Sequence, residues 1–350
     1  MQRGARVLTA QPALSSYGAD DTGLICGFAF APGEPPRALA SEGLAEAVAA
    51  LRAGELAGAG FAWLHFNLAH TATERWLQRH AALEAGFFEA LADGLRSTRI
   101  ERDDEALVAV VNDVRFDFAF TPQDLSTLWV SVDRRLVVTA RQAPLRSIDR
   151  LRVAVKGGLA LRSTVELLER LLREQAGVLV DIVRQVTRDV DGVEDALLSG
   201  KLAPKRARLG ALRRLLVRLQ RLLAPEPASL LRLLQHPPDW IDEGEAQQLR
   251  EAAEEFSVAL RDMAALQERI KLLQEEVSAM VDERTSRSLF VLTVVTVLAL
   301  PINILAGLFG MNVGGVPLAQ HPHGFWVVTA IVVTFTAVAG WLALRRRDDE

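Results

Sequence analysis

The most distinctive chemistry in the sequence lies in GLFGMNVGGVP, residues 307–317, between two long stretches without a charged side chain. Four of its eleven residues are glycine, and Asn312 is its only strongly polar side chain. An amide oxygen can accept a hydrogen bond from a metal-bound water or approach a cation directly. Gly310, Gly314 and Gly315 permit close backbone approach, so carbonyl groups can also face an ion. Because no charge is present, an ion held here can also leave, which conduction requires.

A histidine pair follows in the same uncharged stretch, at His321 and His323. Imidazole is a good zinc ligand, and copies from several chains would form a ring. The proline between them bends the pair, and an interfacial loop can also carry two histidines by chance. The remaining histidines (His65, His70, His80 and His236) are scattered and are expected to be structural.

Two apolar segments flank this motif. Residues 288–344 contain no Asp, Glu, Lys or Arg, and within them 289–309 and 325–344 are each long enough to cross a hydrocarbon core of about 30 Å as a helix. The alternative, two buried helices of a soluble protein, is disfavoured because such helices normally have a polar face. The sequence therefore predicts two transmembrane helices.

The flanking charges predict the orientation of these spans. Arg284 and Arg287 precede the first span, residues 345–347 are three arginines after the second, and the linker has neither Lys nor Arg. The positive-inside rule places both termini in the cytoplasm and the linker outside. The N-terminus lacks the apolar core of a secretory signal, so it is expected to stay where it is made.

A long helix is predicted to lead into the first span, because no proline or turn cluster occurs from about Gly244 to Pro301. Continued to Phe309, it would extend roughly 100 Å, a length typical of a stalk or coiled coil. One face of it repeats apolar residues in steps of 3 and 4, which is a heptad seam that needs a partner. The seam consists of Phe256, Ala259, Met263, Leu266, Ile270, Leu273, Val277 and Met280.

A second stripe, offset by two positions, continues into the membrane span. There it consists of Leu289, Thr293, Thr296, Leu300, Asn303, Gly307 and Gly310. Lipid cannot satisfy polar side chains, so this face must meet protein or water. A ring of identical first spans would enclose a central pore. The alternative is that Thr293 and Thr296 bond back to their own helix while Asn303 joins two helices.

Three carboxylates continue the same stripe before the membrane, at Glu268, Glu275 and Asp282. In a ring they would concentrate cations at the cytoplasmic mouth of a pore. The alternative is three ordinary solvated carboxylates.

The first 155 residues read as mixed α/β, with short runs rich in β-branched and aromatic residues. Strands are expected at 23–30, 61–66, 106–111, 115–120, 127–132 and 135–140, and helices at 43–53 and 74–92. Residues 146–190 and 193–223 follow a helical pattern, which Gly-Lys-Leu-Ala-Pro at 200–204 breaks. The basic run 201–221 is either a patch for nucleic acid or anionic lipid, or the solvated face of a helix paired with acidic neighbours.

Composition narrows the classes of function. The 350 residues carry a net charge of −4, so nucleic acid is not a favoured partner. The single cysteine, Cys26, excludes an internal disulfide and a thiolate zinc cage within one chain. We find no phosphate-binding loop, nucleophile elbow or metalloprotease helix, so no enzyme activity and no cofactor are expected.

The order of these features resembles the CorA superfamily of divalent metal ion transporters. The resemblance rests on a stalk helix running into a first span, then Gly310-Met311-Asn312, an uncharged loop, a second span and a basic end. The extension from Asn312 to Pro317 is similar to the ZntB zinc-transporter branch. Phe309 stands where magnesium-branch members usually have tyrosine, which also favours the zinc-type branch.

This resemblance implies an α+β cytosolic domain, a long stalk helix and two C-terminal transmembrane helices in a homopentameric funnel and pore. It implies that Gly310, Met311 and Asn312 form the outer mouth, with Asn303 and Leu300 as an inner site and a constriction. The expected divisions are a cytosolic α/β domain (1–155), a helical hairpin region (156–243), the stalk and first span (244–309, the span from about 288), the outer loop (310–324), the second span (325–344) and the tail (345–350).

The resemblance further implies a multi-pass protein of the bacterial inner membrane that carries a divalent cation. Zinc is the expected ion, with or without proton coupling, and Mg, Co, Ni and Cd are the alternatives. A magnesium or broad divalent channel of the same fold remains open, as does a membrane-tethered adaptor whose spans only anchor it. The expected partners are copies of the same chain, divalent cations and the lipid bilayer.

Overall fold

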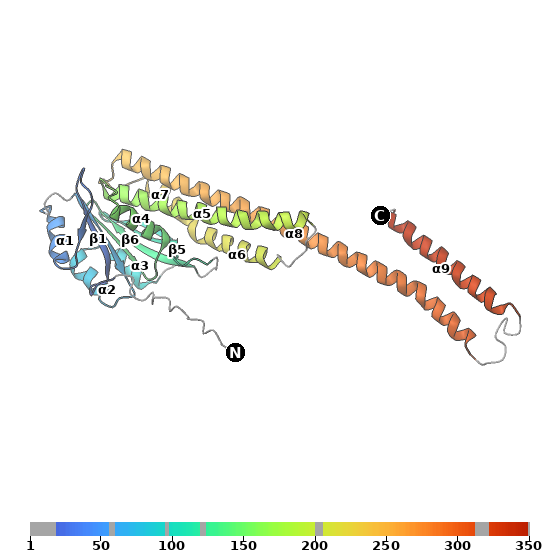
Figure 1. Ribbon diagram of the computed structural model, residues 1–350. Helices are drawn as coiled ribbons and strands as arrows, with labels where there is room; N and C mark the ends of the chain where they lie inside the picture. Colours follow the sequence, from blue (N-terminus) through green and yellow to red (C-terminus); the bar gives the residue numbers. More distant parts are fainter. Residues whose placement is uncertain are drawn as a thin grey trace, which may run out of the picture. The chain divides into compact units, whose positions relative to one another are not determined.

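The computed structural model describes residues 19–55, 60–94, 98–119, 124–199, 206–311 and 322–348. The chain divides into two compact units, Met1–Leu272 and Leu273–Glu350. The first unit contains a sheet with its helices, and the second contains the apolar end of the chain (Figure 1).

A seven-stranded sheet forms the centre of the first unit, in the order β2-β1-β3-β7-β6-β5-β4. Only the β3–β7 pair is parallel among the described strands, and the other pairs are antiparallel. The strands are β1 (Leu24–Phe30), β2 (Arg37–Leu39), β3 (Phe61–Asn67), β4 (Arg99–Asp103), β5 (Ala106–Val114), β6 (Leu125–Val132) and β7 (Leu136–Arg141).

Helices cover both faces of the sheet, and the central strands show why. Every residue of β5 and β7 is buried, which requires cover on both faces. On one face, alternate strand residues such as Leu64, Val110 and Val138 pack with Leu77 and Phe87. The elements on this face are α1 (Leu44–Ala53), α2 (Thr73–Trp76), a π-helical turn η2 (Leu77–Ala81) and α3 (Ala85–Ala92).

Four helices lie on the other face (Figure 1). They are α4 (Arg146–Lys156), α5 (Thr164–Leu198), α6 (Arg206–Leu223) and α7 (Pro225–Leu233). The start of α5 resembles a capping box: the hydroxyl of the N-cap Ser163 accepts the N–H of Glu166, and the Glu166 carboxylate accepts the N–H of Arg162, one residue before the N-cap. This signal fixes where a helix of 35 residues begins.

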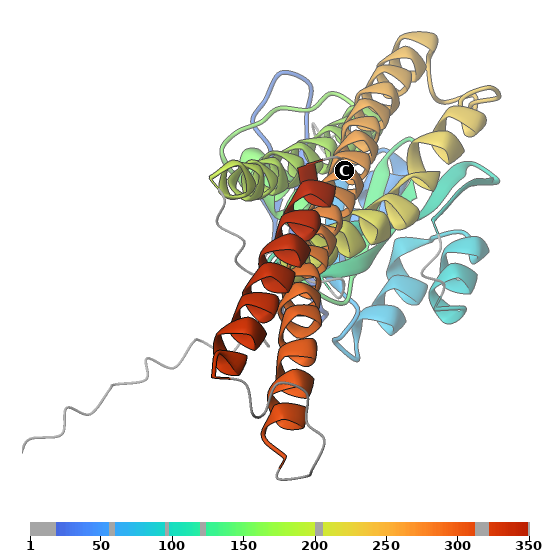
Figure 2. The ribbon, with the colours of Figure 1, turned by 90° about the vertical axis from the view of Figure 1, so that its right-hand side faces the viewer.

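Helix α8 (Glu243–Phe309) has 67 residues and enters both units. It begins with a reciprocal capping box, in which Asp242 Oδ1 accepts from the Glu245 N–H and Glu245 Oε2 accepts from the Asp242 N–H. The predicted heptad seam is confirmed as a buried face from Phe256 to Val277, with Met280 half-buried. Within the second unit, α9 (Gly324–Asp348) runs in the opposite direction to the second half of α8 (Figures 1 and 2).

Five of the six predicted strands are confirmed, but the one at 115–120 is wrong. Arg115 forms only an isolated bridge to Leu145, and the chain then turns, with Arg115 paired to Asp117. The aromatic alternation arises from a loop whose Phe118 is buried beneath the Arg146 guanidinium. The short strands β2 and β4 were not predicted.

Two predicted helices are interrupted. The helix expected over 74–92 breaks at Ala82, which adopts a left-handed conformation with φ of 47°. The pattern over 146–190 breaks after Lys156, where Gly158 has φ of 97°, a value that glycine adopts without strain. Within the basic run, Arg208 pairs with Asp189 on α5, whereas Arg214, Arg218 and Arg221 are exposed on α6.

Candidate functional site

The second half of α8 and most of α9 are apolar and uncovered. Both helices are long and apolar enough to cross a membrane, and in the apolar window of α8 no residue is buried. Large side chains such as Leu289, Val291 and Phe325 are more than half exposed. Apolar surface on this scale is unstable in water, so lipid or other subunits must cover it.

The polar side chains of the first apolar segment lie on one side of the helix. Between Leu289 and Phe309 they are Thr293, Thr296 and Asn303 alone. At 100° per residue these three fall within an arc of about 80°. On a straight helix, Glu268, Glu275 and Asp282 fall within or next to that arc. Because the stripe repeats every seven residues, its direction rotates around the helix axis by about 20° per heptad. All six residues are exposed.

The threonine hydroxyls bond back to their own helix. Thr293 Oγ1 donates to the Leu289 carbonyl and Thr296 Oγ1 to the Leu292 carbonyl, each over 2.8 Å. Thr329 on α9 does the same with Phe325, so this bond is common to threonines of both apolar helices. It uses the hydroxyl proton and leaves the oxygen lone pairs available as acceptors.

Pro301 lies inside α8, between Leu300 and Asn303. Proline has no N–H, so the carbonyl of Val297 lacks its usual helical donor four residues later. Leu300 and Asn303 are both exposed. The segment therefore combines an amide side chain, a bulky apolar side chain and a backbone carbonyl without its regular helical donor within two turns. This carbonyl was not among the positions predicted from the sequence.

The helix ends at the glycine of the Gly-Met-Asn motif. Gly310 donates its N–H to the Ala306 carbonyl over 2.9 Å, and a Cβ at Gly310 would lie 3.0 Å from that oxygen. A side chain at position 310 would therefore crowd the last turn. Met311 is half exposed. Asn312 and His321 lie outside the described residues.

His323 directly precedes α9. It is exposed, and its carbonyl accepts the N–H of Val327 over 3.2 Å in the first turn. Within the described ranges of this single chain, no three His, Cys, Asp or Glu side chains are grouped so that they could hold a metal ion.

The three predicted acidic positions differ in their surroundings. Glu268 pairs with Lys271 over 2.9 Å, and both side chains are exposed. In the part of the chain that the structure describes, Glu275 and Asp282 have no ion pair. Nearby, Arg269 binds Asp191 and Glu194 on α5. Glu268 therefore has a basic side chain beside it, and Glu275 and Asp282 do not pair with one in the described part of the chain.

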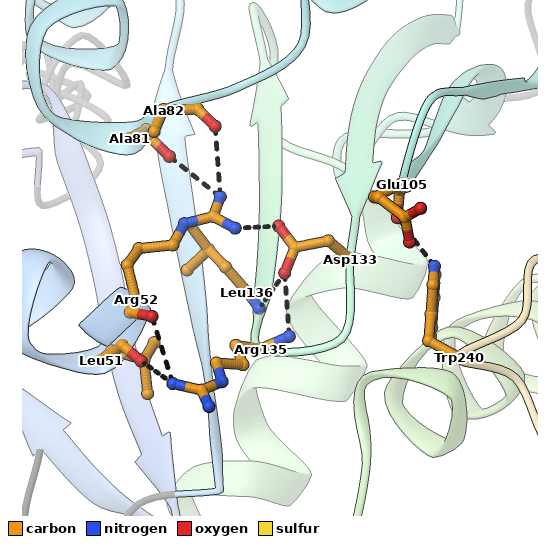
Figure 3. Close-up of polar contacts among 9 residues, drawn as sticks. All are labelled: Leu51, Arg52, Ala81, Ala82, Glu105, Asp133, Arg135, Leu136 and Trp240. Atoms are coloured by element: carbon orange, nitrogen blue, oxygen red, sulfur yellow. Dashed lines mark hydrogen bonds and ion pairs between the residues drawn. The ribbon is translucent and has the colours of Figure 1, made fainter. Parts of the chain in front are cut away.

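The first unit also contains a polar pocket of about 370 Å³. Arg52 pairs with Asp133 over 2.6 Å and donates to the carbonyls of Ala81 and Ala82 (Figure 3). Arg135 donates to the carbonyls of Leu51 and Arg52, which closes the C-terminus of α1. Three arginines and four carboxylates line the pocket, so its charges nearly balance and favour neither a cation nor an anion.

Trp240 forms another wall of this pocket and donates its indole N–H to the Glu105 carbonyl (Figure 3). Because Trp240 lies three positions before the first residue of α8, this bond connects the start of the long helix to the β4–β5 turn. The pocket was not predicted from the sequence, because its walls come from distant parts of the chain.

A second polar cluster is buried in the sheet around His65. Arg141 Nε donates to His65 Nε2 over 2.9 Å, so the ring proton is on Nδ1, which donates to Thr139 Oγ1. Burial lowers the pKa of His65 well below its ordinary value, and the charges of Arg141 and Arg152 add to this effect. His65 is thus a neutral structural residue, as the sequence analysis expected.

Together these features define a class of protein: a membrane protein with a mixed α/β soluble domain, a long helix and two C-terminal apolar helices. The family model described as "CorA-like Mg2+ transporter protein" matches residues 58–346. The chain therefore belongs to the CorA family, and it is a divalent cation transporter, not an enzyme.

Curated relatives match over most of their length. The chain is 27% identical over 287 residues to the "Divalent cation transporter CmaX" of Pseudomonas aeruginosa, covering 81% of this chain and 86% of the relative. It is 24% identical over 281 residues to the "Zinc transport protein ZntB" of Pectobacterium atrosepticum, covering 80% and 86%. The resemblance to the CorA family and its ZntB branch is confirmed.

Solved structures have the same fold. The full-length CmaX protein matches with a TM-score of 0.76 at 25% identity, over 94% of this chain and 99% of that one. The CorA magnesium transporter of Methanocaldococcus jannaschii matches with a TM-score of 0.72 at 19% identity, over 91% and 96%. The predicted fold class is thus confirmed in its soluble domain, long helix and two apolar helices.

Proposed function

We propose that five copies of this chain form a pore lined by their first apolar segments, and that zinc is the ion carried. The observation that carries the pore is the single polar stripe of Thr293, Thr296 and Asn303 on an otherwise apolar, uncovered helix. Facing lipid, this stripe would leave the Asn303 amide and the acceptor lone pairs of the two threonine hydroxyls in hydrocarbon, although the hydroxyl protons bond to their own helix. Facing a common axis, it meets water and ions.

The drift of the stripe supports helices that supercoil around one another. On straight helices, the stripe would rotate by about 100° over the 35 residues from Glu268 to Asn303. A left-handed supercoil keeps such a repeat facing one axis. Glu275 and Asp282 then form carboxylate rings below the membrane, and Asn303, Leu300 and Asn312 follow towards the other end.

The choice of zinc draws on two sources. The ZntB relatives are named as zinc transport proteins, and His321 and His323 would add imidazoles near the outer mouth. Magnesium is the second candidate, because magnesium takes oxygen ligands and usually keeps several of its waters, and the stripe supplies only amide and hydroxyl oxygens. A pore that offers only such oxygens inside the membrane suits a largely hydrated ion of either kind.

Both termini lie in the cytoplasm in this arrangement, and the loop between the apolar segments faces outward. The arginines at 284, 287 and 345–347 support this orientation. The membrane in this proposal is the bacterial inner membrane, because the named relatives are transport proteins of bacteria. Proton coupling is an open variant of the mechanism.

The test is a flux assay on the purified full-length protein in liposomes. Zinc and magnesium entry are compared with ion-specific dyes, with and without a pH gradient. Zinc flux that exceeds magnesium flux supports the zinc proposal, and the reverse order assigns the chain to magnesium. Flux of neither ion contradicts the proposed pore and favours a role as a membrane-tethered adaptor.

The outer site and the pentamer are tested on the same preparation. Asn312→Ala is expected to reduce flux, while Thr329→Ala on α9 serves as a control outside the proposed pore. Unchanged flux in Asn312→Ala removes Asn312 from the ion path. Native mass spectrometry is expected to give five chains per particle, and any other number contradicts the pentamer.

A further inference from the structure

Glu226 and Gln175 are two buried polar residues for which ion transport gives no reason. Glu226 is in the first turn of α7 and is 1% exposed, and Gln175 is in the middle of α5 and is 4% exposed. Carboxylates are almost never fully buried without a partner. A glutamate in the first turn of a helix normally faces solvent.

The surroundings of both side chains are apolar. They line a cavity of about 20 Å³ whose other walls are Ile100, Leu107, Ala109, Val111, Val130, Val132, Leu168, Leu171, Leu172 and Leu230. These walls come from β4, β5, β6, α5 and α7. No wall supplies a cation, so an ionised Glu226 would be a buried charge without compensation.

The hydrogen bonding is incomplete in a specific way. Glu226 Oε2 and Gln175 Oε1 are both buried without a hydrogen-bond partner. The Gln175 amide N–H₂ points to the Asn112 carbonyl, 3.5 Å away. Two acceptor oxygens in one cavity require a donor, and a proton on Glu226 supplies one.

We propose that Glu226 and Gln175 form an internal proton-binding site that holds α7 against α5 and the sheet. Protonated Glu226 donates to Gln175 Oε1, so both orphaned oxygens are satisfied without charge. Loss of the proton leaves a carboxylate among aliphatic side chains, which loosens α7 from α5. The site thereby makes the packing of the helical layer depend on pH.

The electrostatics act in the same direction. Burial raises the pKa of Glu226 well above its ordinary value and Asp113 on β5 raises it further, whereas a hydrogen bond with the Gln175 side chain lowers it by a smaller amount. Asp113 is the one titratable group in the described ranges that acts on Glu226. Its own carboxylate accepts from the Val114 N–H and from the N–H and hydroxyl of Ser147 at the start of α4. These bonds favour the charged form of Asp113, although burial raises its pKa to about 6.

The first test compares wild type and Glu226→Gln as full-length proteins in detergent. Unfolded glutamate releases its proton near pH 4.3, whereas native Glu226 keeps it, so wild-type stability falls as pH rises above that value. Above that pH, the unfolding equilibrium constant of the soluble domain should rise more steeply in wild type than in Glu226→Gln. The difference should be about an extra factor of ten for each pH unit. Glu254→Gln, an exposed position on α8, is the matched control and should behave as wild type.

The second test detects the proton directly. Infrared spectra of wild type at pH 7 should contain the carbonyl band of a protonated carboxylic acid, and Glu226→Gln should lack it. Identical pH profiles for wild type and Glu226→Gln would overturn the proposal. If that variant does not fold, the infrared spectrum of wild type at pH 7 tests the proposal by itself. Absence of the protonated band would overturn it and would mean that a buried water or another donor serves the two oxygens.

Discussion

Trp240 donates its indole N–H to the carbonyl of Glu105 over 2.7 Å, although the two residues are 135 positions apart. Trp240 stands in the loop before α8, and Glu105 lies in the turn between β4 and β5 beside Asp104, whose φ is 48°. The longest helix of the chain is thus tied at its start to an edge hairpin of the sheet. Through this hydrogen bond, a movement of the hairpin would displace the first turn of α8.

Replacing Trp240 with phenylalanine should loosen this junction. The ring is largely kept, but the Glu105 carbonyl loses its donor, and we expect a loss of about 1 kcal/mol of stability, or less because the site is partly exposed. Hydrogen exchange should speed up in the first two turns of α8 and in the β4–β5 turn. Unchanged exchange in both segments would show that the bond does not hold the junction.

Phe256 tests the seam of α8. It is completely buried, whereas Val258, two positions away, is 45% exposed. Phe256→Ala should cost about 3–5 kcal/mol because it leaves a cavity in the packed face. Val258→Ala is the control and should change stability by about 0.5 kcal/mol or less. Chemical denaturation of the full-length protein measures both, and equal losses would contradict the seam.

The loss of native stability at acid pH should come in part from the protonation of His65 in the unfolded chain. Its pKa is lowered in the native state, so between the ordinary value near 6.5 and the lower native value the unfolded chain binds a proton that the native chain does not. Stability should therefore fall as pH drops below about 6.5, by up to about 1.4 kcal/mol per pH unit.

His65→Gln is the variant that isolates this effect. Its amide oxygen can accept from Arg141 and its N–H₂ can donate to Thr139, but it does not titrate. Denaturation between pH 5 and pH 7.5 should give a flatter profile for His65→Gln than for wild type. His80→Gln, an exposed position, should keep the wild-type slope. A wild-type slope in His65→Gln would show that other groups cause the acid sensitivity.

The sequence predicted the elements that depend on local pattern. Runs such as FAWLHF form strands because β-branched and aromatic residues suit a sheet buried on both faces. The charged edge strand β4, with the sequence RIERD, was missed because four of its five side chains are charged and lack that signal. The break at Gly157-Gly158 was missed because the helical pattern on either side was strong.

Of the candidate functional residues, some could also be predicted from local pattern and others could not. The stripe of Thr293, Thr296 and Asn303 follows from helical phase alone, so it could be read from the sequence. The pocket around Arg52 and Asp133 and the pair Glu226–Gln175 could not, because tertiary packing brings their members together from distant positions. Their side chains carry no periodic signal.

Asn303 offers the sharpest test of the polar stripe. Asn303→Leu replaces an amide by an apolar side chain of similar size, next to Leu300 and Pro301. In the proposed pore this change removes five ion-facing amides and extends the apolar constriction, so divalent flux should fall by about tenfold or more, which corresponds to at least about 1.4 kcal/mol of added barrier. Ile304→Leu is the control one position on, where flux should stay near wild type. If both variants conduct alike in liposomes while remaining assembled, Asn303 does not face the ion path, and its role is to join helices within the membrane.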